Sequence, residues 1–242
     1  GARMCDGALV GLADKLRVAR MRSALTAQSL DDIFSAPEQT TRQVLATRWG
    51  FSDLMIDRFF RPFFGGVFFD TELNASSRLF EFLFKMFAEG DTTVPAQGMQ
   101  AIPTQLAAQL PSDCIDLNTQ VAAIENNQVR FDDGTSAPAS AIVIATDAPA
   151  AHNLLGDETI STKQRSTTCL YYAAHESPLD NPILALNGDQ DGLLNNVAVM
   201  SDVAPSYAPD GETLISAVVV GDPLEDDDAL ERTVRRELID WF

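Results

Sequence analysis

The chain has 242 residues, with 35 acidic and 17 basic side chains, so its formal net charge is −18. This charge argues against nucleic acid and against an anionic membrane surface as partners, because both are polyanions. Apolar residues make up 45% of the sequence and include 14 phenylalanines, which is enough for a sizeable core in one large domain or two lobes.

No apolar run approaches the length of a membrane span and no signal peptide is visible, so we expect no integral membrane segment. Cys5, Cys114 and Cys169 are odd in number and far apart, which gives neither a disulfide framework nor metal-ligand spacing. We therefore predict free, buried thiols in a reducing compartment and a cytoplasmic location. Because the chain opens at Gly1 without an initiator Met, it gives no test of a targeting signal.

The first third of the chain has the pattern of a helical region. Periodic leucines predict a helix over residues 7–25. Residues whose side chains can cap a helix predict where the later helices begin, and glycines predict where they end. The last of these helices is expected to run to about Ala88. The starts are Ser29, Thr40 or Thr41, Ser52 and Ser76, and the ends are Gly50, Gly65-Gly66 and Gly90.

Residues 121–150 predict a small sheet followed by a helix. Short strands over 121–125 and 129–131 are joined by Asn126-Asn127, and Asp132-Asp133-Gly134 is a strong hairpin signal. The continuous apolar run at 141–145 predicts a strand covered on both faces. Asp147 is the expected N-cap of the next helix, with Pro149 in its first turn.

After residue 162, four runs rich in β-formers predict a largely antiparallel sheet over residues 167–174, 183–186, 194–200 and 213–220. An amphipathic helix closes the chain at Trp241-Phe242, and the acidic residues that lead it complement the helix dipole. Between two of these strands, Asn187-x-Asp189-x-Asp191-Gly192 mimics the start of a calcium loop. Its twelfth position holds Ala198 instead of Glu, so we predict a polar turn and no metal site.

Several motifs in the same order resemble the superfamily of FAD-dependent amine oxidases and phytoene desaturase-like flavoproteins. They are the run DRFFRPFFGGVFFDTEL at 57–73, the loop with Pro95, Gly98, Met99, Pro103 and Leu106, the β-meander at 121–145, and the later LYYAAHESP, LALNG and LERTVRRELIDWF. The resemblance covers essentially the whole chain.

The resemblance implies an α+β fold. A helical insertion and a mixed, largely antiparallel sheet form the substrate domain, and a helix, β-meander and buried strand come from the FAD-binding domain. The implied boundaries are 1–96 for the helical part of the substrate domain, 97–161 for the FAD-domain portion, and 162–242 for the sheet and terminal helix.

FAD is the implied cofactor of the intact protein. The resemblance implies that Val121 and the strand end at Ala145 and Thr146 contact the dinucleotide with main-chain groups, and that Gly98-Met99 lies close to the flavin ring. A residue without Cβ allows such a close approach. No Gly-x-Gly-x-x-Gly fingerprint occurs, and the second flavin segment of the family is also missing. We therefore expect a central portion of a flavoenzyme that alone neither retains FAD nor turns over substrate.

The phenylalanine cluster at 59–87 predicts helix–helix core for most of its members. Phe63, Phe64 and Phe68, beside Gly65-Gly66, are the first candidates for an apolar substrate tunnel, and Tyr172 is a further substrate candidate. This composition suits a polyene or prenyl-type substrate oxidised by hydride transfer to flavin.

One departure from the family concerns the lysine that flavin amine oxidases usually place on a substrate-domain strand. The corresponding segment, 171–175, has no lysine and Lys163 lies too early, which favours a desaturase-like or isomerase-like reaction. No residue is an obvious catalytic base. The alternatives are a non-enzymatic module that binds an apolar ligand or a partner, and a true amine oxidase. Apolar surface around residues 142–144 predicts a homodimer.

Overall fold

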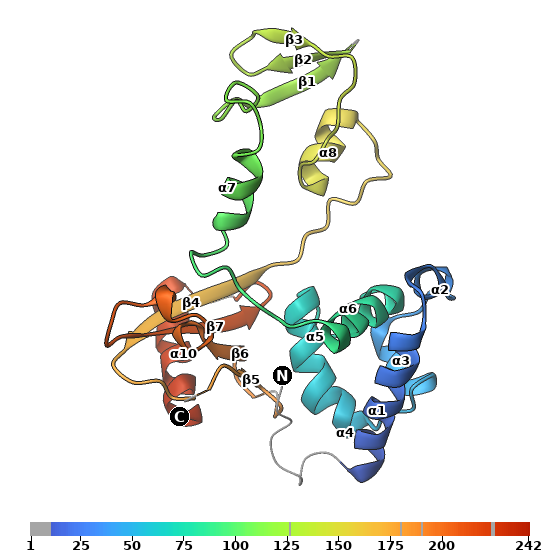
Figure 1. Ribbon diagram of the computed structural model, residues 1–242, viewed down its shortest axis with the longest axis vertical. Coiled ribbons are helices and arrows are strands. Elements are labelled where there is room, and N and C mark those ends of the chain that lie inside the picture. Colours follow the sequence, from blue (N-terminus) through green and yellow to red (C-terminus); the bar gives the residue numbers. More distant parts are fainter. Residues whose placement is uncertain (1–10, 126, 180, 190, 224–225) are drawn as a thin grey trace. The chain divides into compact units, whose positions relative to one another are not determined.

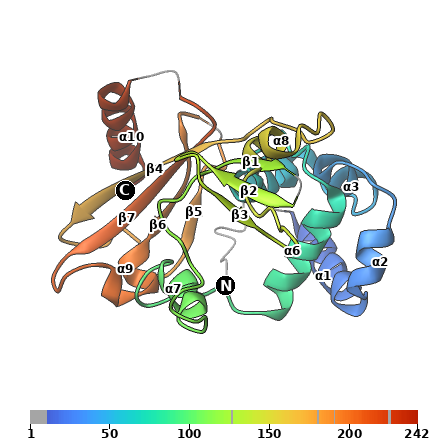
Figure 2. The same ribbon diagram turned by 90° about the horizontal axis from the view of Figure 1, so that it is seen from above.

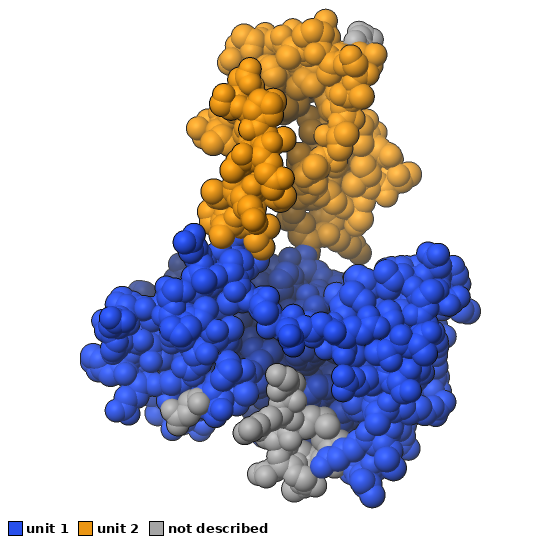
Figure 3. Space-filling model, in the orientation of Figure 1, with its two compact units in different colours: residues 1–99, 165–242 blue, residues 100–164 orange. Residues whose placement is uncertain are grey.

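The computed structural model describes residues 11–125, 127–179, 181–189, 191–223 and 226–242. The chain forms two compact units (Figure 3): unit 1 is Gly1–Met99 with Arg165–Phe242, and unit 2 is Gln100–Gln164. Helices and two antiparallel sheets make up the α+β fold that the sequence predicts (Figure 1). Cys5 and the predicted helix start at residue 7 lie outside the described residues, as do Asn126 of the predicted turn and Glu225 of the acidic run.

The first part of unit 1 is helical. Its elements are α1 Leu12–Ala27, α2 Leu30–Ser35, α3 Thr41–Thr47, α4 Asp53–Met55, the π-helical turn η1 Ile56–Phe60, α5 Arg61–Phe68 and α6 Ser77–Glu89. The predicted N-caps at Ser29, Thr40, Ser52 and Ser76 are confirmed, and the first two form reciprocal capping boxes.

The prediction that Gly65-Gly66 breaks a helix is wrong. Helix α5 runs through both glycines and ends at Phe68, followed by the C-cap Phe69, whose φ of 51° is left-handed. A Cβ on Gly65 would lie 3.3 Å from Thr71 Cα, and one on Gly66 would lie 2.8 Å from Asn195 Nδ2. The two glycines therefore allow α5 to pack closely against its neighbours, and this packing outweighs their low helix propensity.

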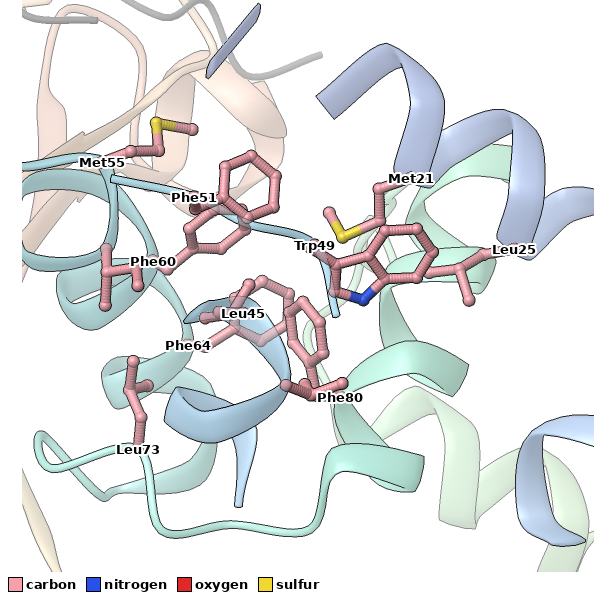
Figure 4. Packing of buried hydrophobic residues seen from close by; sticks show 12 residues of the cluster. Met21, Leu25, Leu45, Trp49, Phe51, Met55, Phe60, Phe64, Leu73 and Phe80 are labelled. Carbon is pink, nitrogen blue, oxygen red and sulfur yellow. The ribbon is translucent and has the colours of Figure 1, made fainter. Parts of the chain in front are cut away.

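The core of the helical part is rich in aromatic rings (Figure 4). Phe60, Phe64 and Phe80 are completely or almost completely buried, and the rings of Phe64 and Phe80 meet edge to face with centroids 4.7 Å apart. Trp49 and Leu45 of the α3 region complete the same cluster. Most of the phenylalanine-rich sequence thus supplies core packing.

The second part of unit 1 is a four-stranded antiparallel sheet in the order β4-β7-β6-β5, and each predicted strand is present. Helix α10 packs on one face of this sheet (Figure 2). Its Leu230 and Val234 meet Val197, Val199 and Ala217 in a second core. The elements are β4 Thr167–Ala174, β5 Leu184–Leu186, β6 Leu194–Val199, α9 Met200–Val203, the 3₁₀ turn η2 Pro205–Tyr207, β7 Thr213–Val220 and α10 Asp227–Trp241.

Unit 2 contains the predicted meander between two helices. Its elements are α7 Ala101–Ala107, β1 Val121–Glu125, β2 Gln128–Phe131, β3 Ser136–Pro138 and α8 Ala148–Leu155. Gly134 has a φ of 85° at the predicted hairpin turn, and Asp147 caps α8 by accepting a 2.8 Å hydrogen bond from Ala150 N.

The prediction of a buried strand at residues 141–145 is wrong. This run is not part of a sheet, and Val143 is 89% exposed. A strand requires hydrogen-bonded neighbours, and none of the described strands pairs with this run. None of the described residues of unit 2 is fully buried.

Among the described residues, no helix combines the length and the apolar character that crossing a bilayer requires.

Candidate functional site

The four-stranded sheet of unit 1 has one face that turns away from α10. Directly opposed residues on neighbouring strands share a face, so the pairing register defines which side chains lie there. We call this surface the open face, and it consists of Thr167, Cys169, Tyr171, Ala173, Leu184, Leu186, Asn196, Ala198, Leu214, Ser216, Val218 and Val220. None of these side chains is charged, and on the edge strand β4 they are exposed to solvent.

Three polar side chains lie together on the open face. Tyr171 is directly opposite Ser216, and the Cys169 Sγ lies 3.2 Å from the Ser216 Oγ. Tyr171 is 64% exposed, whereas Ser216 is only 8% exposed. The hydrogen bond with Cys169 raises the pKa of the Tyr171 phenol, while Ser216 lowers it. The phenol therefore stays protonated at neutral pH and can donate a hydrogen bond.

The prediction of buried thiols is wrong for both described cysteines, because Cys114 and Cys169 are exposed. Cys169 lies on an edge strand whose outer side chains alternate with those that face α10. That alternation from residue 167 to 174 is visible in the sequence, with Leu170 and Tyr172 between the outward positions. The grouping with Ser216 required the strand register, which the sequence does not specify.

Tyr172, predicted to contact substrate, lies on the opposite side of the sheet. Its ring packs into the second core beneath the Arg235 guanidinium, whose Cζ is 5.2 Å from the ring centroid. The hydroxyl is buried without a hydrogen-bond partner. Burial, followed by the charge of Glu231, raises the Tyr172 pKa, and Arg235 opposes this effect.

The predicted substrate residues Phe63, Phe64 and Phe68 belong to one aromatic cluster in the helical part of unit 1. Phe64 is 1% exposed, so a ligand could reach it only after the core opens. Phe63 is partly buried and meets the ring of the surface residue Phe87 at 5.6 Å. The structure brings these residues together around a packed core.

A separate groove of about 460 Å³ lies between the start of α5 and the ends of β6 and β7. Arg61, Pro62, Leu194 and Val219 line it, and none of the predicted site residues does. Arg61 is already paired with Glu72 at 2.8 Å and donates to Thr71 O.

The residues predicted to contact the cofactor fall in both units. Gly98 and Met99 belong to unit 1, and Val121, Ala145 and Thr146 belong to unit 2. Gly98 has a φ of 83° with no atom near the position of a Cβ, and Met99 is 62% exposed. Val121 is half-buried on β1, whereas Ala145 and Thr146 are exposed just before α8.

The family model for flavin containing amine oxidoreductases matches residues 4–242. The chain belongs to this family. No curated protein matches the chain.

Three solved structures share the fold. An oxidoreductase from Methanosarcina mazei superposes with a TM-score of 0.69 at 19% sequence identity. The alignment covers 96% of this chain and 57% of the oxidoreductase chain. The PF1083 protein from Pyrococcus furiosus superposes with a TM-score of 0.68 at 14% sequence identity. The alignment covers 93% of this chain and 61% of the PF1083 chain. Reduced UDP-galactopyranose mutase superposes with a TM-score of 0.57 at 14% sequence identity. The alignment covers 93% of this chain and 56% of the mutase chain. This chain therefore spans less than two thirds of each of them.

Flavin is the cofactor that family membership implies, and the described residues fit only part of it. The main chain at Ala145 and Thr146 is exposed and could contact a dinucleotide. The N-terminus of α8 is already occupied by the Asp147 carboxylate, whose negative charge disfavours a pyrophosphate there. No glycine-rich loop joins a strand to a helix within the described ranges.

The sheet of this family member carries no lysine. The three lysines of the sequence are Lys15, Lys85 and Lys163, which lie on α1, on α6 and in unit 2. Lys85 is buried and donates to Leu25 O, Thr26 O and the Glu89 carboxylate. Its contacts show a structural role at the end of α1.

The acidic turn before β6 is held in place by hydrogen bonds within the protein. Asn187 Nδ2 donates 2.7 Å hydrogen bonds to Asp191 O and Leu194 O, and the Glu237 carboxylate of α10 accepts from Leu193 N. Within the described ranges, no group of three or more His, Cys, Asp or Glu side chains is arranged to hold a metal ion. Residue 190 of the turn lies outside those ranges.

Proposed function

We propose that the intact protein is an FAD-dependent oxidoreductase that oxidises an apolar, polyene or prenyl-type substrate. The observation that carries this proposal is the family match over residues 4–242. A bound flavin supplies a hydride acceptor, while protein side chains bind the substrate, orient it and exclude water. We assign residues 1–96 and 162–242 to the substrate domain and 97–161 to the FAD domain.

The character of two surfaces supports an apolar substrate. The open face carries no charged side chain, and the helical part of unit 1 presents Phe63 and Phe68 at the edge of an aromatic core. Phe64 and Tyr172 would support these two surfaces from the cores beneath them. No general base is assigned, because the open face includes no acidic or histidine side chain.

Cofactor contacts are proposed at Gly98, Met99, Val121, Ala145 and Thr146. These residues can offer main-chain atoms to FAD, but the described chain has no pyrophosphate-binding loop. We therefore expect the 242-residue chain alone to retain little FAD. Its exposed thiols suit a reducing cytoplasm, which we propose as its location.

Amine oxidation is the second candidate, and the family description favours it. The absence of a lysine from β4 and the rest of the four-stranded sheet favours the desaturase-like reaction instead. A non-enzymatic module for an apolar ligand is a third candidate, favoured by the missing pyrophosphate loop.

Anaerobic flavin reduction by the full-length protein separates these candidates. Phytoene and benzylamine serve as the two probes, and peroxide release is followed on readmission of air. We expect reduction with phytoene and none with benzylamine. Reduction and peroxide release only with benzylamine would replace our proposal with amine oxidation. A protein that holds no flavin at all would leave only the ligand-binding module.

A further inference from the structure

We propose that Ser206 and Tyr207 are positioning residues, which hold the loop at residues 95–99 in the conformation that contacts FAD. Both residues belong to η2, and their hydrogen bonds to the loop span 110 and 112 residues of sequence. This inference rests on the proposed function, in which Gly98 and Met99 contact the cofactor, and it adds the residues that fix those contacts in place.

Two neighbouring side chains of η2 donate hydrogen bonds to two neighbouring carbonyl groups of the loop. Tyr207 Oη donates to Pro95 O at 2.8 Å, and Ser206 Oγ donates to Ala96 O. Because both acceptors are main-chain atoms, these contacts define the path of the backbone and do not depend on the side chains that the loop carries.

The Tyr207 contact falls on the carbonyl that closes the turn before Gly98. Gly98 N donates to Pro95 O at 3.0 Å, so this oxygen accepts two hydrogen bonds, one for each of its lone pairs. Gly98 has a φ of 83°, and no atom lies within 4 Å of the position of a Cβ there. Tyr207 therefore supports the turn that sets the conformation of Gly98, where a ligand can approach the backbone closely.

The sheet of unit 1 supports η2 in turn. Helix α9 follows β6 directly, and the Ser201 hydroxyl of α9 accepts a hydrogen bond from Leu214 N of β7 at 3.1 Å. Ala204, between α9 and η2, is buried, and its carbonyl accepts from Tyr207 N at 3.0 Å. The two hydroxyls that hold the loop thus stand on a segment that is itself fixed to the sheet.

A loop that is fixed before the cofactor arrives loses little conformational entropy when the cofactor binds. Without either hydroxyl, FAD itself would have to order the loop, and its affinity would fall. A residue with a packing role alone would lower the stability of the fold and leave the affinity for FAD unchanged. Affinity and loop order together therefore distinguish positioning from packing.

Titration of the full-length apoprotein with FAD, followed by flavin fluorescence, measures the affinity. Tyr207→Phe and Ser206→Ala should each raise the Kd for FAD about fivefold, the equivalent of one hydrogen bond. Ser206→Thr keeps the hydroxyl and should retain the wild-type Kd. Thr47→Val is the matched control, because Thr47 Oγ1 donates to Gln43 O at 2.8 Å within α3, and losing that bond should leave the Kd unchanged.

Hydrogen exchange of the same proteins without flavin measures the order of the loop. Peptides that cover residues 96–99 should exchange about fivefold faster in Tyr207→Phe and Ser206→Ala, because the turn opens more often. Peptides of β6 and β7 should exchange as in the wild type. Ser206 is exposed, so Ser206→Ala tests the inference even if Tyr207→Phe fails to fold.

The outcomes separate this inference from the proposed function. If the full-length wild type binds FAD and Ser206→Ala leaves both the Kd and loop exchange unchanged, the inference is overturned and the oxidoreductase proposal stands. Faster exchange of β6 and β7 in both variants would show a packing role and would also overturn the inference alone. A wild-type protein that binds no FAD would overturn both.

Discussion

Buried charges in the helical part of unit 1 each have partners from elements distant in sequence. Glu81 of α6 is 2% exposed and accepts two hydrogen bonds from Arg48 Nη1, at 2.8 and 2.9 Å, and a third from Trp49 Nε1 at 3.0 Å. Burial raises the pKa of Glu81, and Arg48 and Trp49 oppose that rise. This carboxylate ties α6 to the end of α3.

Replacing Glu81 by Ala should therefore destabilise the protein substantially. We expect a loss of about 2–3 kcal/mol in the free energy of unfolding, because Arg48 and Trp49 lose their acceptor in a buried site. Chemical denaturation measures this loss. Glu72→Ala is the control, because its pair with Arg61 is exposed and should cost less than about 0.5 kcal/mol. Equal effects of the two substitutions would contradict the role of Glu81.

Asp14 provides a pH-dependent link between α1 and α4. It is 5% exposed and accepts hydrogen bonds from Ser52 Oγ at 2.6 Å, Ser52 N at 3.2 Å and Arg17 Nη1 at 2.8 Å. Burial alone would raise its pKa, but the Ser52 and Arg17 interactions together lower it below 3.8. Because the unfolded chain binds this proton more readily, the stabilisation is full above the unfolded pKa and is lost as pH falls through the lower folded value.

Asp14→Asn should consequently destabilise the protein at pH 7 by about 1–3 kcal/mol and have little effect at pH values below the folded pKa. Urea unfolding of both proteins from neutral to strongly acidic pH measures the difference. A destabilisation that stays constant over this range would show that the carboxylate charge is not responsible.

At the scale of elements, local side-chain chemistry predicted helix starts better than helix ends. Ser29, Thr40, Ser52 and Asp147 cap helices through hydrogen bonds to nearby backbone, so the sequence alone sufficed. The pair Gly65-Gly66 wrongly predicts a helix end, because the role of Gly66 depends on its contact with Asn195, which lies far away in the chain. The strand prediction at 141–145 failed for the same reason, since a strand depends on partners that local sequence does not supply.

The packing of α5 on β6 gives a prediction for Gly66. Alanine usually stabilises a helix interior relative to glycine by about 1 kcal/mol. Here Gly66→Ala should destabilise by about 1–3 kcal/mol, because its Cβ would displace the amide of Asn195, which donates to Pro62 O at 2.9 Å. Thermal unfolding measures the change.

A double variant controls this prediction. The double variant Gly66→Ala/Asn195→Ala should lose less than the sum of the two single changes, because the clash is gone. Strict additivity would contradict the proposed contact.

At the scale of the whole molecule, unit 2 differs from unit 1 in having no fully buried residue among those described. The helical cluster and the sheet core of unit 1 could be predicted from apolar periodicity. The contact between Cys169 and Ser216 on the open face could not be predicted, because it depends on the pairing register of two strands, which the apolar pattern of the sequence does not determine.

The exposed apolar run of unit 2 should drive self-association. We expect the chain to sediment as a dimer at high concentration, and Val143→Ser to shift it toward monomer, since Val143 is 89% exposed. Val203→Ser, in unit 1, is the matched control and should leave association unchanged. A monomer at all concentrations would contradict this prediction.

The central claim is that this family member works with a flavin, and the visible absorption spectrum tests it most directly. After reconstitution with FAD and removal of the free cofactor, the full-length protein should show the absorption of one bound oxidised flavin per chain, and the 242-residue chain should show almost none. A colourless full-length protein would contradict the claim.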